Sequence, residues 1–108
     1  MKASQKIARL RKLSSEQVLR AELFYDILEE CEALKPDYSN YASTHPIDCN
    51  RELRQFDAAN YELCCALITM LLREDYFSNG TFDRRQRSGQ VKPIIDRMIM
   101  LLENESNT

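Results

Sequence analysis

Apolar residues recur along the chain at helical spacing, and they are concentrated in two segments. The denser one is 63-LCCALITMLL-72, where apolar side chains fall on every side of a helix. A helix without a polar face is normally enclosed by its neighbours, so we expect a central helix over 58–73. The second segment, 94-IIDRMIMLL-102, predicts a closing helix over 91–103, with Pro93 in its first turn.

The N-terminal half predicts two helices of opposite charge. Residues 3–13 carry one apolar stripe between lysines and arginines, which is typical of a basic helix. Residues 15–35 combine a wide apolar face with an acidic one, and Pro36 disfavours helix beyond them. Two prolines and many small polar residues predict a loop over 36–56, with room for a short helix near its end.

Both glycines lie in the joint between the two apolar segments. Gly80 and Gly89 allow the chain to reverse twice, because glycine adopts positive φ at low cost. The residues between them predict a short helix over 81–87. Phe77 and Phe82 are interpreted as apolar plugs that fold this joint back onto the core. The elements together predict an all-α fold, a compact bundle of four to five helices forming a single domain over 1–108.

The amino-acid composition supports an all-α fold and indicates the cellular compartment that we expect for the protein. Two glycines and three prolines in 108 residues are too few for the turns of an all-β fold. The longest uninterrupted apolar run, Leu63–Ile68, has six residues, too short to span a bilayer, and the N-terminus lacks the apolar stretch of a signal peptide. The four cysteines form no C-x-x-C pair, so we expect a cytoplasmic protein with reduced thiols.

The sequence offers few residues that would support catalysis or metal binding. The sequence contains no G-x-G-x-x-G, P-loop, H-E-x-x-H or G-x-S-x-G motif. The single histidine, His45, would need Cys49 and further ligands, yet Cys64 and Cys65 point about 100° apart on a helix. We therefore expect no enzyme activity, no catalytic residues, no bound metal and no cofactor.

Two kinds of binding remain open. Arg84, Arg85 and Arg87, with Lys92, form the densest basic cluster, which suits either phosphate contact or a solvated helix face. The net charge of −2 provides no overall basic field, so a nucleic-acid-associated regulator is the alternative interpretation. The abundant apolar surface, including the methionines of 98-MIMLL-102, favours a non-enzymatic protein-interaction module whose partner is a protein, including a homodimer.

One stretch of the joint also carries a family pattern. It consists of an Arg-x-acid-x-Phe turn, a glycine, a second glycine nine residues later, and an Ile/Leu-rich helix. Here these features are Arg73, Asp75, Phe77, Gly80, Gly89, Ile94, Ile95, Arg97 and Met98. The stretch over 73–98 resembles a family of small bacterial and phage-associated proteins known only as a domain of unknown function. The resemblance implies a helical fold and brings no assigned activity.

Overall fold

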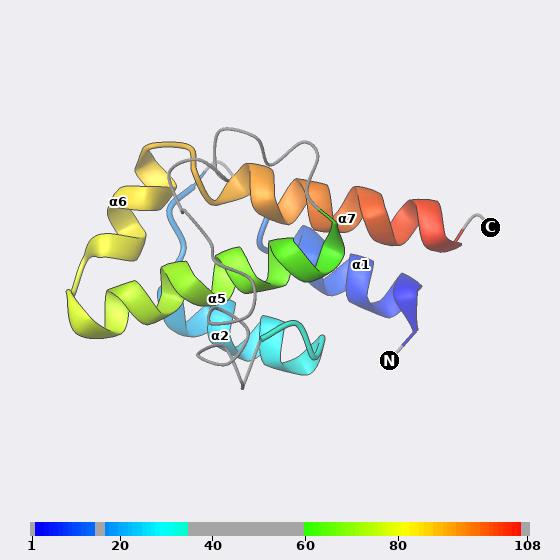
Figure 1. Cartoon of the computed structure of the whole chain (residues 1–108), viewed down its shortest axis with the longest axis horizontal. Coiled ribbons are helices and arrows are strands. Elements are labelled where there is room, and N and C mark those ends of the chain that lie inside the picture. Colours follow the sequence, from blue (N-terminus) through cyan, green and yellow to red (C-terminus); the bar gives the residue numbers. More distant parts are fainter. Residues whose placement is uncertain (1, 15–16, 35–59, 107–108) are drawn as a thin grey trace.

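The computed structural model of the chain describes residues 2–14, 17–34 and 60–106, which form helices and no strand (Figure 1). The all-α bundle predicted from the sequence is confirmed. In these residues the helices are α1 (Ala3–Arg11), α2 (Ala21–Glu30), α5 (Tyr61–Phe77), α6 (Thr81–Arg87) and α7 (Lys92–Ser106). The predicted loop over 36–56, with His45 and Cys49, lies outside the described residues.

The central position of α5 follows from its sequence. The helix runs through the middle of the bundle, with α2 and α7 on either side (Figure 1). Leu67, Ile68, Leu71 and Leu72 are completely buried, and each contributes about 1.5–3 kcal/mol through removal from water. Asn60 begins the helix, because its side-chain oxygen accepts a hydrogen bond from the Leu63 amide at 2.8 Å.

Opposite charges hold the N-terminal helix against its neighbours. Arg9 on α1 pairs with Glu30 on α2 at 2.7 Å, which joins the predicted basic and acidic helices. Arg11 pairs with Glu103 on α7 at 3.1 Å. Both pairs are substantially exposed, and such pairs contribute about 0–1 kcal/mol. The buried Leu10 on α1 supplies the stronger, apolar contribution to this packing.

The joint between α5 and α7 uses both glycines as expected. Gly80 precedes α6 with a φ of 90°, and Gly89 follows it with a φ of 74°. The Asp75 carboxylate accepts hydrogen bonds from the amides of Gly80 (3.1 Å) and Phe82 (3.0 Å), so it caps the start of α6 from the preceding helix. At the other end, the Gly89 and Gln90 amides donate back to carbonyls of α6 in the Schellman arrangement.

Two side chains of α6, Phe82 and Gln86, contact residues in the N-terminal half of the chain. Phe82 is fully buried, as predicted, and its ring meets that of Phe24 edge-on at a centroid distance of 4.8 Å. The Gln86 side chain accepts from the Leu19 amide at 2.9 Å and donates to the Leu19 carbonyl at 2.8 Å. The short helix is therefore part of the core, held by tertiary contacts.

The predicted extent of the second helix is wrong at both ends. Residues 17–20 are not helical, and α2 begins only at Ala21. The Ser14 hydroxyl, in the segment between α1 and α2, hydrogen-bonds to Asp96 on α7. The helix ends at Glu30, well before Pro36, because Glu32 takes a φ of 58° and the Ala33 amide donates to the Leu28 carbonyl. A left-handed glutamate has no sequence signature comparable to glycine.

Candidate functional site

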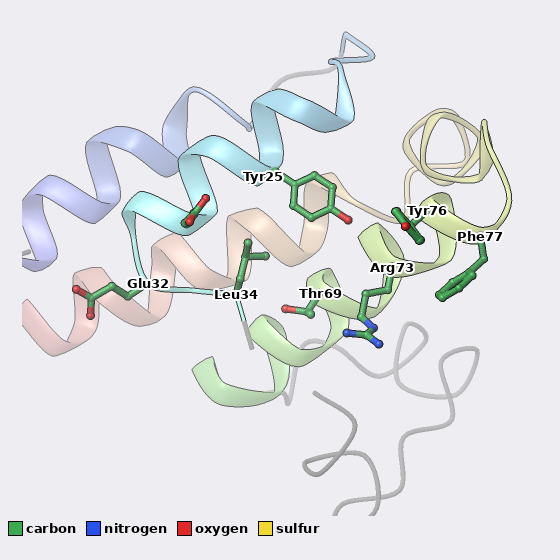
Figure 2. Close-up of a pocket in the computed structure, with 8 residues that line it drawn as sticks. Tyr25, Glu32, Leu34, Thr69, Arg73, Tyr76 and Phe77 are labelled. Atoms are coloured by element: carbon green, nitrogen blue, oxygen red, sulfur yellow. The ribbon is translucent and has the colours of Figure 1, made fainter. Parts of the chain in front are cut away.

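A cavity of about 640 Å³ lies between α2 and the C-terminal half of α5 (Figure 2). This cavity is called the α2–α5 groove. A volume of this size falls within the range of about 300–1,000 Å³ that is common for ligand-binding pockets. The described residues that line it come from both helices and from the segment after α2: Tyr25, Glu29, Glu32, Leu34, Thr69, Arg73, Tyr76 and Phe77.

Two aromatic rings form the lip of the groove. The last turn of α5 leaves Tyr76 79% exposed and Phe77 80% exposed, with their rings edge-on at a centroid distance of 5.2 Å. The prediction that Phe77 plugs the core is wrong. Because α5 continues as a helix through Phe77, this residue falls on the same face as the exposed Arg73, four positions earlier.

The polar groups at the floor of the groove are already hydrogen-bonded within the fold. The Tyr25 hydroxyl donates to the Leu72 carbonyl at 3.1 Å, and the Thr69 hydroxyl donates to the Cys65 carbonyl at 2.7 Å. Burial raises the pKa of Tyr25, and the nearby negative charge of Asp75 raises it further. The phenol therefore stays neutral at physiological pH, and the floor offers shape and apolar contact more than acid–base chemistry.

The two ends of the groove differ in charge. Glu29 and Glu32 lie at one end, at the C-terminus of α2, and both are exposed. Arg73, also exposed, lies toward the other end with the aromatic lip. Figure 2 shows Glu32 and Phe77 at opposite ends, with Leu34, Tyr25 and Thr69 between them. The groove is thus an apolar trough with two carboxylates at one end and the guanidinium of Arg73 toward the other.

The structure divides the basic cluster predicted around α6. Arg85 makes a two-point contact with Glu74, with Nε–Oε1 at 3.1 Å and Nη2–Oε2 at 3.0 Å. Its Nη1 donates to the Gln90 side chain at 2.8 Å, and only 21% of the arginine side chain is exposed. Arg85 therefore braces α6 against α5, and the interpretation of Arg85 as a solvated residue is wrong.

The other three cations of the cluster do not share one site, because Arg84 does not line the cavity that Arg87 and Lys92 line. Arg84 is exposed, and its guanidinium donates to the Thr81 hydroxyl at 3.3 Å. Arg87 and Lys92 line a second, smaller cavity of about 240 Å³ beside Phe24. The Lys92 ammonium also pairs with Asp96 at 2.8 Å, which places negative charge next to it. A cluster that looks continuous in sequence is therefore spread over different surroundings.

Most members of the family pattern shape the joint and the helix after it. Asp75 caps α6, while Gly80 and Gly89 supply positive φ on its two sides. Arg97 lies partly buried on α7, where its positive charge lowers the pKa of Cys64 and opposes the effect of burial. Two further members, Arg73 and Phe77, differ from the rest because they line the groove.

The thiols of the described residues behave as core side chains. Cys31, Cys64 and Cys65 are free and buried. Burial raises the pKa of Cys64 to about 11, so this thiol stays protonated and unreactive near neutral pH. In the part of the chain that the structure describes, no three His, Cys, Asp or Glu side chains are grouped to hold a metal ion. Among the same residues, no helix has the length and apolar character needed to cross a membrane.

Sequence reasoning missed the groove itself. Its walls come from Tyr25 and Leu34 in one part of the chain and from the last turn of α5 in another, and no local pattern joins them. One available signal was the absence of any helix-breaking residue between Leu72 and Asn79. That run allows α5 to continue past Arg73, and helical spacing then places Phe77 beside Arg73.

Comparison with known proteins places the chain in a family while leaving its activity open. No curated protein and no solved structure gives a significant match. A family model described as "Family of unknown function (DUF6508)" matches residues 5–104. The match extends far beyond the joint over 73–98, to every helix described above. The chain therefore belongs to the family of unknown function DUF6508.

Proposed function

We propose that this protein is a non-enzymatic protein-interaction module and that it docks its partner in the α2–α5 groove. The observation that carries the proposal is the aromatic lip, where Tyr76 and Phe77 are about four-fifths exposed beside a cavity of about 640 Å³. Aromatic residues are enriched among the side chains that dominate the energetics of protein interfaces.

The lip has a large apolar surface that its own fold leaves in water. A tyrosine or phenylalanine can bury roughly 150–250 Å² when it is enclosed, which makes such side chains strong anchors. In the same helix, eight side chains one to three turns earlier are buried. The groove continues this apolar surface inward through Leu34 and Tyr25, so a partner side chain inserted there would meet apolar walls.

A binding role fits the groove better than a catalytic one. The two hydroxyls of its floor, on Tyr25 and Thr69, donate to backbone carbonyls and are not arranged as nucleophile and base. The raised pKa of Tyr25 moves that group further from neutral pH, opposite to what general acid–base catalysis requires. We propose a cytoplasmic setting, because Cys31, Cys64 and Cys65 are free thiols enclosed in the core.

The alternative, a nucleic-acid-associated regulator, has one observation in its favour: Arg84 and Arg87 are exposed. Against it, Arg85 is held by Glu74 and Lys92 lies against Asp96. Phosphate binding depends on many uncompensated cations acting together, so these pairs weaken the interpretation. Titration with duplex DNA and RNA at low and high salt tests it directly. Binding that falls steeply with salt would support the regulator, and we expect no such binding.

Peptide selection on the intact protein tests the proposed function. We expect a random-peptide display library to yield ligands for the wild-type chain, and the double variant Tyr76→Ser/Phe77→Ser to bind them roughly tenfold or more weakly. Met100→Ser is the matched control, because Met100 is an exposed apolar residue on α7 that does not line the groove. Failure to enrich any peptide, or equal binding by the double variant, would refute the groove as a docking site.

A further inference from the structure

We infer that the partner docked in the α2–α5 groove is a basic amphipathic helix. It is a helical segment of another protein, with one apolar face and with lysine or arginine at the end that meets Glu29 and Glu32. The inference rests on the proposed function and adds the chemistry of the partner. It is carried by the shape of the trough, the charge at one end and the exposed rings at the other.

The trough has the direction and length of a short helix. It lies between α2 and α5, which run in opposite directions (Figure 1). On α5 its lining extends from Thr69 to Phe77, and these residues lie about 12 Å apart along the helix axis, roughly two turns. An amphipathic helix fills such a groove by placing apolar side chains against it at positions i, i+3 or i+4, and i+7.

One end of the groove carries negative charge that the fold does not neutralise. Glu29 and Glu32 are exposed, and neither carboxylate forms an ion pair with another residue that the structure describes. Glu30, beside Glu29, is by contrast paired with Arg9 at 2.7 Å. Arg73, toward the other end, already interacts within the chain. The charge that the groove offers to a partner is therefore negative.

The C-terminus of α2 adds to this negative charge. The last carbonyl groups of a helix carry a partial negative charge, which favours cations nearby. The last turn of α2 contains no basic residue of its own. Glu32 follows the helix with a φ of 58°, so a carboxylate occupies a backbone position that glycine would adopt more easily. A lysine or arginine of the partner would be attracted by the helix end and by both carboxylates.

The apolar part of the groove matches the apolar face of the partner. Leu34 and Tyr25 line the trough between Glu32 and the aromatic lip (Figure 2). At the far end, Tyr76 and Phe77 are about four-fifths exposed. A helix seated in the trough covers these rings with apolar side chains and directs its basic residue to the opposite end. Charged contacts at the margin of an interface then fix the orientation of the partner.

The sequences of the peptides selected from the random library test the inference. Peptides that bind the wild type should carry apolar residues at helical spacing and lysine or arginine beyond one end of that pattern. The same library selected against the double variant Glu29→Lys/Glu32→Lys should instead yield aspartate or glutamate at that end. Circular dichroism establishes that the variant is folded, and lysine near the C-terminus of α2 also suits the helix dipole.

One selected peptide, synthesised in two forms, gives the decisive measurement. The basic form keeps its lysines and arginines, and the acidic form has glutamate in their place. The basic form should bind Glu29→Lys about tenfold or more weakly than the wild type, and the acidic form should bind Glu29→Lys more tightly than the wild type. Asp83→Lys is the matched control, because Asp83 is exposed on α6 and does not line the groove. Its affinity for the basic form should stay close to that of the wild type.

Glu32→Gly separates binding from folding. The variant loses a carboxylate of the groove, yet glycine suits the positive φ at this position. The urea concentration at half-unfolding should therefore not fall, while the basic peptide should bind several-fold more weakly. Unchanged binding of the basic peptide by both Glu32→Gly and Glu29→Lys would overturn the inference.

Two other results would also overturn it. The first is a set of selected peptides that need the aromatic lip but show no excess of basic residues, or whose apolar residues alternate as in an extended chain. That result would uphold the groove as a docking site while excluding a basic helix. The second is a wild-type dimer that the selected peptide dissociates, since a second copy of the chain would then occupy the groove. Failure to enrich any peptide would instead refute the proposed function, and the inference with it.

Discussion

The last turn of α5 and the following helix α6 differ in which kinds of side chain they expose to solvent. The turn exposes two aromatic rings, Tyr76 and Phe77, to solvent. The helix α6 turns Arg85 toward α5, where Glu74 and Gln90 bind it from two sides. By residue type alone, the rings belong in the core and the arginine belongs in water.

The difference shows that helical register outweighs residue type near the ends of a bundle. Glu74 and Phe77 lie three residues apart on α5, yet Glu74 faces α6 and Phe77 faces the groove. The run Cys64–Leu72, buried apart from Met70, sets the rotation of the helix, so the direction of each later side chain is fixed. An apolar residue in an exposed register position is then available for a partner.

The largest effect is expected from placing a charge on the buried side of α5. Leu71→Asp should unfold the protein, because an unpaired carboxylate in the core costs several kcal/mol, a large share of the stability of a small domain. The far-UV circular dichroism spectrum should lose its helical signal. Tyr76→Asp is the matched control on the same helix and should remain folded. If both variants stayed folded, the burial of α5 described above would be wrong.

The buried half of α5 should also respond to alkaline pH through Cys64. Burial raises the pKa of this thiol in the folded state from its ordinary value of 9.0 to about 11. Above about pH 9 the unfolded chain therefore loses the proton while the folded chain keeps it, so stability is full below that pH and falls as pH rises. The loss should reach about 2 kcal/mol by about pH 10.5.

Urea unfolding with a reductant present measures this loss, and Cys64→Ala separates the thiol from other groups. Burial is also the main cause of the raised pKa values of Cys31 and Tyr25, which act in the same direction. The free energy of unfolding of Cys64→Ala should therefore still fall as pH rises, but less steeply than that of the wild type. Wild type and variant curves that run parallel between about pH 8 and about pH 10.5 would show that Cys64 does not titrate between these states.

A smaller effect is expected from removing the brace between α6 and α5. Arg85→Ala leaves Glu74 without its two-point partner, and we expect a loss of about 1–2 kcal/mol because the pair is only partly exposed. Arg84→Ala on the same helix should change stability by less than about 0.5 kcal/mol. Urea unfolding of both variants measures the difference. Equal losses of stability in the two variants would show that Arg85 is an ordinary surface residue, as the amino-acid sequence alone suggests.

Local signals were enough to predict the framework of the fold. The apolar run over 63–72 identified the central helix, and the two glycines identified the reversals on each side of α6. These signals work because burial on all sides and positive φ each restrict residue type strongly. The end of α2 had no such signal, since Glu32 adopts positive φ that a glycine would adopt more easily.

The candidate site needed contacts between residues distant in sequence, and these could not be predicted. Arg85 finds Glu74 eleven positions away, around a turn whose geometry decides which arginine of the cluster reaches back. Tyr25 and Phe77 line one groove although they belong to different helices. Side-chain partners of this kind depend on the packing angle of the helices, which a one-dimensional pattern does not contain.

The smallest effect is expected at the aromatic lip. Phe77→Ala should change the free energy of unfolding by less than about 0.5 kcal/mol, because four-fifths of the side chain is already in water when the protein is folded. The edge-on contact with Tyr76 contributes little to stability, because both rings are exposed to solvent. Urea unfolding of the protein at low concentration, where a dimer would dissociate, isolates this effect from any partner. A loss above about 1 kcal/mol would mean that Phe77 is part of the core after all, and the groove would then lack the lip on which partner docking depends.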